Sequence, residues 1–262
     1  MNQTDETIRN VQEEVLRTLI IIHEFFTSHN IKYSLHGGTL IGAIREHGFI
    51  EWDDDADLSI TRSYYKRFLK AYADDWKEED IKFDEIRRKF FVNRKGHPKV
   101  WIDLFIYDYI SANVLAQKVK IAGIGFFLAL IRTPEMLITT KARGKYKGWK
   151  FALMKVISSL GQLIPEKKKY QMLSRQHQRF SGKRQYIHRS NDQFHGVKEI
   201  LPKETMENYI LVSFENTKLM VSSQYDIILR RSFGDYMTPV KMEDDVKAHE
   251  MARVKMQRGN KK

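Results

Sequence analysis

The sequence predicts an α+β fold in which helices flank a mixed sheet. Apolar residues recur every three or four positions in residues 5–29 and 63–76, as on the buried face of a helix. Period-two patterns in 52–60 and 99–107 are typical of strands. Residues 110–190 form a third region, whose composition favours helices rich in lysine and arginine. Since 42% of the 262 residues are hydrophobic, the chain can fill a substantial core.

The same patterns fix the order of the elements. We expect, in turn, a helix over 5–29, a strand over 31–35, a helix over 40–46, a strand over 52–60, a helix over 63–76, antiparallel strands over 81–83, 89–94 and 99–107, apolar helices over 121–131 and 151–164, a hairpin of 209–214 with 218–221, and a last helix from Ser222 or Ser223. Ser63 is the expected cap of helix 63–76, and Gly234 is the expected end of the last helix. The inward side chains of that last helix should be Tyr225, Ile228, Leu229 and Phe233.

Composition excludes some classes of protein. No cysteine is present, so disulfides and zinc–thiolate sites are excluded. The polar N-terminus is unlike a signal peptide, and the longest apolar run, 121–131, is shorter than the roughly 18 residues of a membrane span. We therefore expect a cytoplasmic protein.

Positive charge is concentrated in one segment. The whole chain has a formal net charge of +12, whereas residues 141–190 hold fourteen Lys or Arg and one acidic residue, Glu166, a net charge of +13. Such a segment can attract nucleic acid, an anionic membrane or phosphate-rich substrates, or it can be a solvated face with no fixed partner. The apolar helices beside it can lie in a membrane interface or be buried in an insertion.

Acidic residues dominate the stretch from Trp52 to Ile60. In a strand over this stretch, Asp53, Asp55, Asp57 and Ser59 would share one face, and Trp52, Asp54, Ala56, Leu58 and Ile60 the other. Crowded carboxylates repel one another unless a cation lies between them, and oxygen ligands favour Mg²⁺, Mn²⁺ or Ca²⁺ over Zn²⁺. The pattern therefore predicts a metal site at Asp53, Asp55 and Asp57.

A glycine turn precedes the acidic stretch. Gly37 and Gly38 permit close approach of the backbone, and Thr39 is the expected cap of a helix whose N-terminus suits a phosphate. His36 can contact a ligand or be a turn residue, and Arg45 can bind a phosphate or be a surface cation. A phosphate-binding turn beside a metal site is the equipment of phosphoryl or nucleotidyl transfer.

Other sites with similar motifs do not match. A calcium-binding EF-hand loop needs Gly and Glu where this chain has Leu58 and Tyr64. The glycines do not fit the spacing of a dinucleotide-binding site, and no Gly-Lys-Ser/Thr follows them as in a P-loop.

Residues 37–58, G-G-T-L-I-G-A-I-R-E-H-G-F-I-E-W-D-D-D-A-D-L, resemble the LicD/fukutin family of phosphotransferases, in the nucleotidyltransferase-like superfamily. The chain departs from the family pattern at Glu51, where proline is usual. A second similarity is F-G-D-Y-M-T-P from Phe233, followed by His249; we derive no role for Asp235, Tyr236 or His249. The match is specific over 31–70, fair over 99–108 and 210–249, and poor over 110–200.

The resemblance implies a further site residue. Asp103 is the single charge in an apolar strand, which is costly to bury unless it is paired or binds metal. The family's fold places an acidic residue on a strand beside the Asp-x-Asp pair, and this implies that Asp103 is a metal ligand and the base for the acceptor hydroxyl. A structural salt bridge is the alternative. The implied catalytic residues are Asp55, Asp57 and Asp103, with His36, Gly37, Gly38, Thr39 and Arg45 at the donor.

The resemblance also implies the reaction. We expect a Mg²⁺- or Mn²⁺-dependent transferase that moves phosphocholine from CDP-choline to a sugar hydroxyl of a cell-surface glycan precursor, such as lipopolysaccharide or teichoic acid, and releases CMP. Residues 1–110 would be the catalytic core, 111–200 a basic helical insertion facing the acceptor or membrane, and 201–262 a part packed on the core. Residues 118–169 would contact the inner face of the membrane.

Two alternatives remain open. One is a nucleotidyltransferase that uses CTP or ATP. The other is an inactive module whose basic segment binds nucleic acid or membrane; retention of all the carboxylates and of the Gly-Gly turn argues against this loss of catalysis, and we do not expect a nucleic-acid partner.

Overall fold

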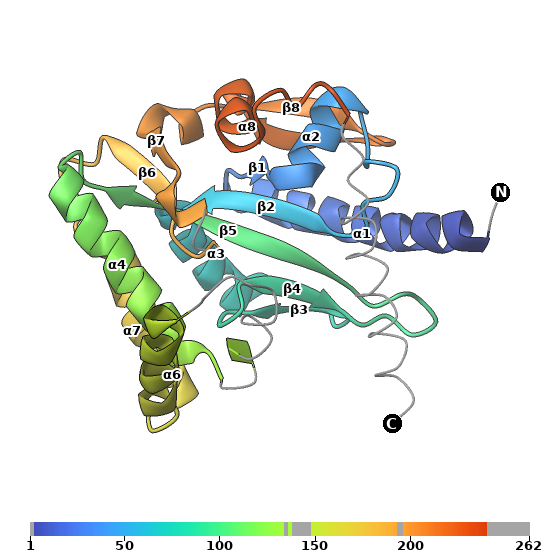
Figure 1. Ribbon diagram of the computed structural model, residues 1–262. Helices are drawn as coiled ribbons and strands as arrows, with labels where there is room; N and C mark the ends of the chain where they lie inside the picture. Colours follow the sequence, from blue (N-terminus) through green and yellow to red (C-terminus); the bar gives the residue numbers. More distant parts are fainter. Residues whose placement is uncertain (1–2, 134–135, 138–147, 193–195, 240–262) are drawn as a thin grey trace. The chain divides into compact units, whose positions relative to one another are not determined.

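The computed structural model describes residues 3–133, 136–137, 148–192 and 196–239 (Figure 1). The chain divides into two compact units. The first unit consists of residues 1–106 and 204–262, and the second of residues 107–203. Helices and strands are both abundant, so the fold is α+β, as predicted.

The sheet of the first unit is built around the acidic strand. Its order is β1-β2-β5-β4-β3, where β1 is Ser34–Leu35, β2 is Ala56–Thr61, β3 is Ile81–Asp84, β4 is Lys89–Val92 and β5 is Val100–Ile110. The pairs β1–β2, β3–β4 and β4–β5 are antiparallel, which confirms the predicted pairing of the last three strands. The acidic strand β2 therefore lies between β1 and β5, and β5 carries Asp103.

Three helices pack with this sheet: α1 (Gln3–Ser28), α2 (Gly37–Arg45) and α3 (Arg62–Asp75). As the periodicity predicted, α1 buries Val15, Leu19, Ile22 and Phe26. A hairpin of β8 (Tyr209–Phe214) and β9 (Thr217–Ser222) follows the short 3-10 helix Lys203–Met206, and then α8 (Tyr225–Phe233). The hairpin lies beside β1, α1 and α2 (Figure 1). Residues from both ends of the sequence therefore share one core.

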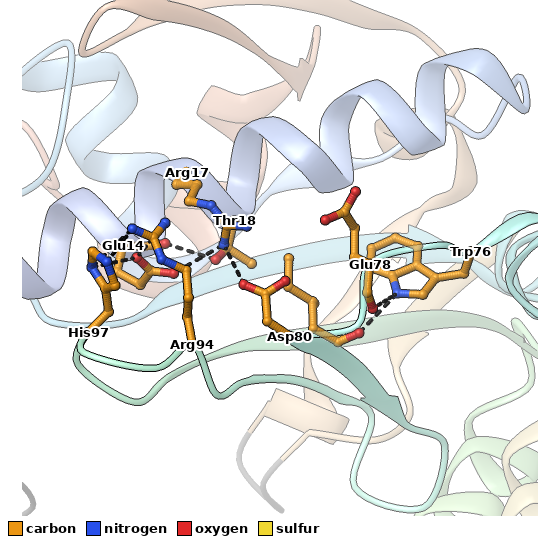
Figure 2. A network of polar contacts seen from close by, with 9 residues as sticks. Glu14, Arg17, Thr18, Trp76, Glu78, Asp80, Arg94 and His97 are labelled. Carbon is orange, nitrogen blue, oxygen red and sulfur yellow. Dashed lines mark hydrogen bonds and ion pairs between the residues drawn. The ribbon is translucent and has the colours of Figure 1, made fainter.

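A polar network joins α1 to the segment that leads into β3 and to the loop between β4 and β5 (Figure 2). The buried carboxylate of Glu14 lies 3.1 Å from Arg17, 3.4 Å from Arg94 and 3.5 Å from His97. Arg17 also pairs with Asp80 at 2.9 Å. A carboxylate with so little exposure is stable only when it is paired, so these contacts fix the position of α1 on the sheet.

The second unit contains the basic helices. It comprises the last residues of β5, α4 (Val114–Ile131), α6 (Trp149–Gly161), α7 (Glu166–Gln178), β6 (Tyr186–Arg189), the 3-10 helix Gly196–Lys198 and β7 (Ile200–Pro202). Tyr107–Ile110 pair antiparallel with β6, which pairs with β7. Both α6 and α7 lie against α4 (Figure 1). A small core of Ile124, Leu173 and Val197 joins α4, α7 and the 3-10 helix.

Several boundaries differ from those predicted. The strand predicted from residue 52 begins at Ala56, and only Ser34 and Leu35 of the stretch 31–35 are strand. Thr61, and not Ser63, is the cap position of α3. Ile228 and Leu229 of α8 are buried as predicted, but Phe233 is 50% exposed because it lies at the very end of the helix, before Gly234 with φ +68°. The apolar helix predicted over 121–131 extends back to Val114, because Asn113 caps it by accepting hydrogen bonds from Leu115 and Ala116.

Candidate active site

The acidic residues lie partly in a loop and partly in a strand. Asp53 and Asp55 belong to the loop that enters β2, and Asp57 is the second residue of that strand. The strand predicted over 52–60 is therefore wrong for residues 52–55. The loop, and not the pleat of a strand, sets where Asp53 and Asp55 point.

The two glycines lie directly against these carboxylates. Gly37 has φ +56°, a conformation that favours glycine, and a Cβ atom there would lie 2.8 Å from Oδ2 of Asp57. A Cβ atom on Gly38 would lie 2.9 Å from Oδ2 of Asp53. Both carboxylates thus rest on the first turn of α2, where N–H groups without partners inside the helix carry partial positive charge. Any larger side chain at either glycine would displace a carboxylate.

Backbone hydrogen bonds fix Asp57 to the turn. The N–H of His36 donates to the carbonyl of Asp57 at 2.9 Å, and the N–H of Asp57 donates to Oγ1 of Thr39 at 2.9 Å. The expectation that Thr39 caps a helix from Leu40 is wrong, because α2 begins at Gly37 with His36 at the cap position. The buried hydroxyl of Thr39 instead holds the acidic strand.

Asp103 comes from the neighbouring strand β5 and has a cation beside it. Lys89 is its register partner on β4, and Nζ of Lys89 donates to Oδ2 of Asp103 at 2.7 Å. The ammonium also lies 5.4 Å from the ring centroid of Trp101. The salt bridge that was the alternative for Asp103 is therefore present. Lys89 was missed from the sequence, although the antiparallel pairing of residues 89–94 with 99–107 could have indicated it.

The carboxylates interact electrostatically. Burial raises the pKa of Asp57 well above its ordinary value, and the negative charges of Asp55, Asp103 and Asp53 raise it further, while Lys89 lowers it. Burial also raises the pKa of Asp103, against the opposing effect of the hydrogen bond from Lys89. Among the residues that the structure describes, no three His, Asp or Glu side chains converge closely enough to hold a metal ion as they stand. The four carboxylates thus form one negative region, with Lys89 as a cation at its edge.

Two residues far away in the sequence hold the loop before β2. The buried side-chain amide of Gln12 in α1 donates to the carbonyl oxygens of Asp53 at 2.9 Å and Ile50 at 3.2 Å. Glu215 lies in the turn of the β8–β9 hairpin. Its side-chain Oε1 accepts from the N–H of Phe49 at 3.2 Å, and its backbone N–H donates to the carbonyl of His47 at 2.7 Å. Neither role could be predicted from local patterns, since the partners lie more than thirty residues apart.

His36 and Arg45 lie at opposite ends of α2. The buried ring of His36 packs against Phe105, with centroids 4.8 Å apart. Arg45 is about 13 Å farther along the helix axis, where it donates to Glu46 at 2.6 Å and to the carbonyl of Tyr236 at 2.8 Å. Tyr236, whose hydroxyl donates to Asp226 at 2.8 Å, thereby ties α8 to α2. A phosphate contact of Arg45 stays a prediction, and His249 lies outside the described residues.

Comparison with known proteins finds a family model that matches residues 30–121, described as LicD/FKTN/FKRP, nucleotidyltransferase domain. The chain is 27% identical over 268 residues to the lipopolysaccharide cholinephosphotransferase LicD of Haemophilus influenzae, with 93% of this chain and 96% of that protein covered. An uncharacterized protein of Rickettsia typhi is 33% identical over 94 residues, 32% of this chain and 26% of its own length. Another, of Rickettsia prowazekii, is 53% identical over 38 residues, 14% of each chain.

Proposed function

The chain belongs to the LicD family of phosphotransferases, and on this basis we propose that it transfers phosphocholine from CDP-choline to a sugar hydroxyl of a cell-surface glycan precursor. The acceptor oxygen forms a bond to the phosphorus that carries choline, the bond from that phosphorus to CMP breaks, and the hydroxyl proton passes to a base. The name of the Haemophilus influenzae relative, a lipopolysaccharide cholinephosphotransferase, supports both the group transferred and a glycan as the acceptor.

One observation carries the proposal: the carboxylates of Asp53 and Asp57 lie against the glycines that begin α2. Phosphate-binding backbone and metal-binding carboxylates thus occupy the same place, as transfer of a phosphoryl group requires. A structural acidic cluster would have no need of glycines at both contact points.

A divalent cation fits the chemistry of the side chains present. All the donors are carboxylate oxygens, which suit Mg²⁺ or Mn²⁺, and the half-buried Asp57 lies near three other negative charges that a cation would offset. Asp53, Asp55 and Asp57 would hold the ion, with Asp103 as a further ligand. Once bound, such an ion neutralises negative charge on the donor diphosphate and on the departing CMP.

The chain's own groups bind the donor and receive the proton. The N–H groups in the first turn of α2, beginning at Gly37, are suited to the diphosphate oxygens, and the buried ring of His36 borders that turn. Asp103 accepts the proton of the sugar hydroxyl, and Lys89 holds the Asp103 carboxylate in place through their 2.7 Å hydrogen bond. Besides the divalent cation, the ammonium of Lys89 would be a second positive charge near the negative charge that develops during transfer.

The proposal is tested by incubating the purified protein with a panel of CDP-alcohols, CTP and ATP, each with Mg²⁺ and candidate glycans, and measuring nucleotide release. We expect CMP from CDP-choline, dependent on both Mg²⁺ and the glycan. Pyrophosphate from CTP or ATP, with no reaction of any CDP-alcohol, would identify a nucleotidyltransferase instead. Absence of turnover with every donor would contradict a catalytic role.

A further inference from the structure

The second unit exposes a stripe of large apolar side chains on α6. Trp149 is 72% exposed, Leu153 50%, Val156 57% and Leu160 56%, and their spacing of four, three and four residues places them on one side of the helix. Leu163, just beyond the helix end, is 81% exposed. Isolated exposed apolar residues are ordinary, but a continuous stripe marks a surface that is covered by a partner.

This exposure is a fixed property of the fold, because the opposite side of α6 is tightly packed. A Cβ atom on Gly161 would lie 2.0 Å from the carbonyl oxygen of Leu130 in α4, so the two helices meet backbone to backbone. The buried hydroxyl of Ser158 donates to the carbonyl of Arg132 at 2.6 Å. Rotating α6 to bury its stripe would break both contacts.

A second exposed apolar stripe lies on α4. Leu115 is 71% exposed, Val119 46% and Phe126 47%, with exposed Ala122 between them. Phe126 also forms a wall of an apolar groove between α4 and α6, together with Ala129, Met154 and Ile157. The groove therefore joins the α4 stripe to the α6 helix, and the apolar surface extends over both.

Of the described helices, α4 is long and apolar enough to cross a membrane by length and composition. Its packing favours a different arrangement. Lys120 is fully buried and donates to the carbonyl of Tyr109 at 2.6 Å, and the carbonyl of Lys120 accepts from Gln176 of α7 at 3.1 Å. One side of α4 is thus committed to polar contacts within the unit, and only the other side is available to lipid.

Lysines flank the apolar surface. Lys150 and Lys155 of α6, Lys118 of α4, and Lys167 and Lys168 of α7 are all exposed. Glu166 is the single acidic residue among residues 141–190. Apolar side chains bordered by cations match the acyl region and the anionic headgroups of a bilayer, and that charge complementarity favours lipid over a second copy of this basic chain.

We propose that α4 and α6 dock the second unit on the surface of an anionic lipid bilayer, with both stripes in the interface and the lysines on the headgroups. Binding to lipid is measured without donor or acceptor, so its outcome is independent of the transferase reaction. The segment 138–147, part of the membrane contact expected from the sequence, lies outside the described residues.

Co-sedimentation with vesicles tests the proposal. The full chain is mixed with vesicles of phosphatidylcholine alone or of equal parts phosphatidylcholine and phosphatidylglycerol, at low and high salt. We expect binding to the anionic vesicles that weakens with salt, and a blue shift in tryptophan fluorescence that Trp149→Phe removes. The double variant Leu153→Ser/Leu160→Ser should bind about tenfold more weakly or worse, since it removes apolar area from the interface.

A matched control is available in the first unit, where Ile210 and Leu211 of β8 are 43% and 54% exposed. Ile210→Ser/Leu211→Ser should leave lipid binding unchanged. Protein that stays in the supernatant with anionic vesicles at low salt would overturn the proposal, as would equal binding by the α6 double variant. Self-association that this variant abolishes, without lipid binding by the wild type, would make a second copy the partner instead.

Discussion

At the scale of single residues, the site consists of carboxylates placed directly against glycine backbone. Gly38 has no positive φ, so only the distance of 2.9 Å from its would-be Cβ atom to Asp53 requires glycine there. A single methyl group at this position therefore tests the contact itself, separately from backbone strain.

We expect Gly38→Ala to lower CMP release at least tenfold, because Asp53 must move away from α2 and an ångström of misplacement is costly to catalysis. Gly96→Ala is the control: its Cβ meets nothing within 4 Å, but the residue has φ +80°, so it loses stability without touching the site. Thermal unfolding and turnover are measured for both variants. Loss of turnover in Gly96→Ala as well would mean that destabilisation alone explains the effect.

His188 makes stability depend on pH. Burial and, to a lesser extent, the charge of Lys120 lower the pKa of His188 to about 4, against the opposing effects of the hydrogen bond to Val197 and the charge of Asp108. The folded state therefore binds fewer protons than the unfolded state between pH 4 and the ordinary histidine pKa of about 6.5. The resulting stability is fully present above that pH and is lost as pH falls toward 4.

Between pH 7 and pH 4.5, this group alone should reduce the free energy of unfolding by about 2 kcal/mol. Urea unfolding of wild type and His188→Gln at both pH values isolates its contribution, because other titrating groups are common to the two proteins. An equal loss of stability in both would contradict the assignment.

At the scale of elements, α1 acts as a brace for the active-site loop. Its buried face carries Gln12, which holds the carbonyls of Ile50 and Asp53, and Glu14, which is fixed by Arg17, Arg94 and His97. The helix thereby connects the acidic loop to the β4–β5 hairpin, whose second strand supplies Asp103.

Replacing Gln12 with leucine should preserve the apolar packing of α1 while leaving two loop carbonyls without their donor. We expect a loss of about 1–3 kcal/mol in unfolding free energy and a roughly tenfold or greater fall in kcat. The Mg²⁺ concentration for half-maximal rate should rise, a change that a merely structural residue would not produce. Gln12→Asn, which keeps the amide on a shorter side chain, should retain more activity than the leucine variant; equal and normal kinetics in both would exclude a positioning role.

At the scale of the whole molecule, patterns within a short stretch of sequence predicted the secondary structure well. Features that depend on contacts between distant stretches could not be predicted in this way. The helical stripe of α1 and the antiparallel strands of residues 81–107 followed from local periodicity. The strand predicted over the acidic stretch begins later than expected, because Gln12, about forty residues earlier, binds the carbonyl of Asp53 and holds this part of the chain as a loop. Similarly, the contact of Arg45 with Tyr236 could not be predicted, because its partner lies 191 residues away, whereas a phosphate contact of Arg45 stays a prediction.

The central claim is that the acidic residues beside Gly37 and Gly38 serve transfer and not folding. The most direct test is CMP release from CDP-choline by wild type and Asp57→Asn at saturating Mg²⁺, with thermal unfolding measured in parallel. Because Asp57 is half-buried among like charges, asparagine should abolish turnover while leaving the melting temperature equal or higher. Near-normal turnover by Asp57→Asn would contradict the account.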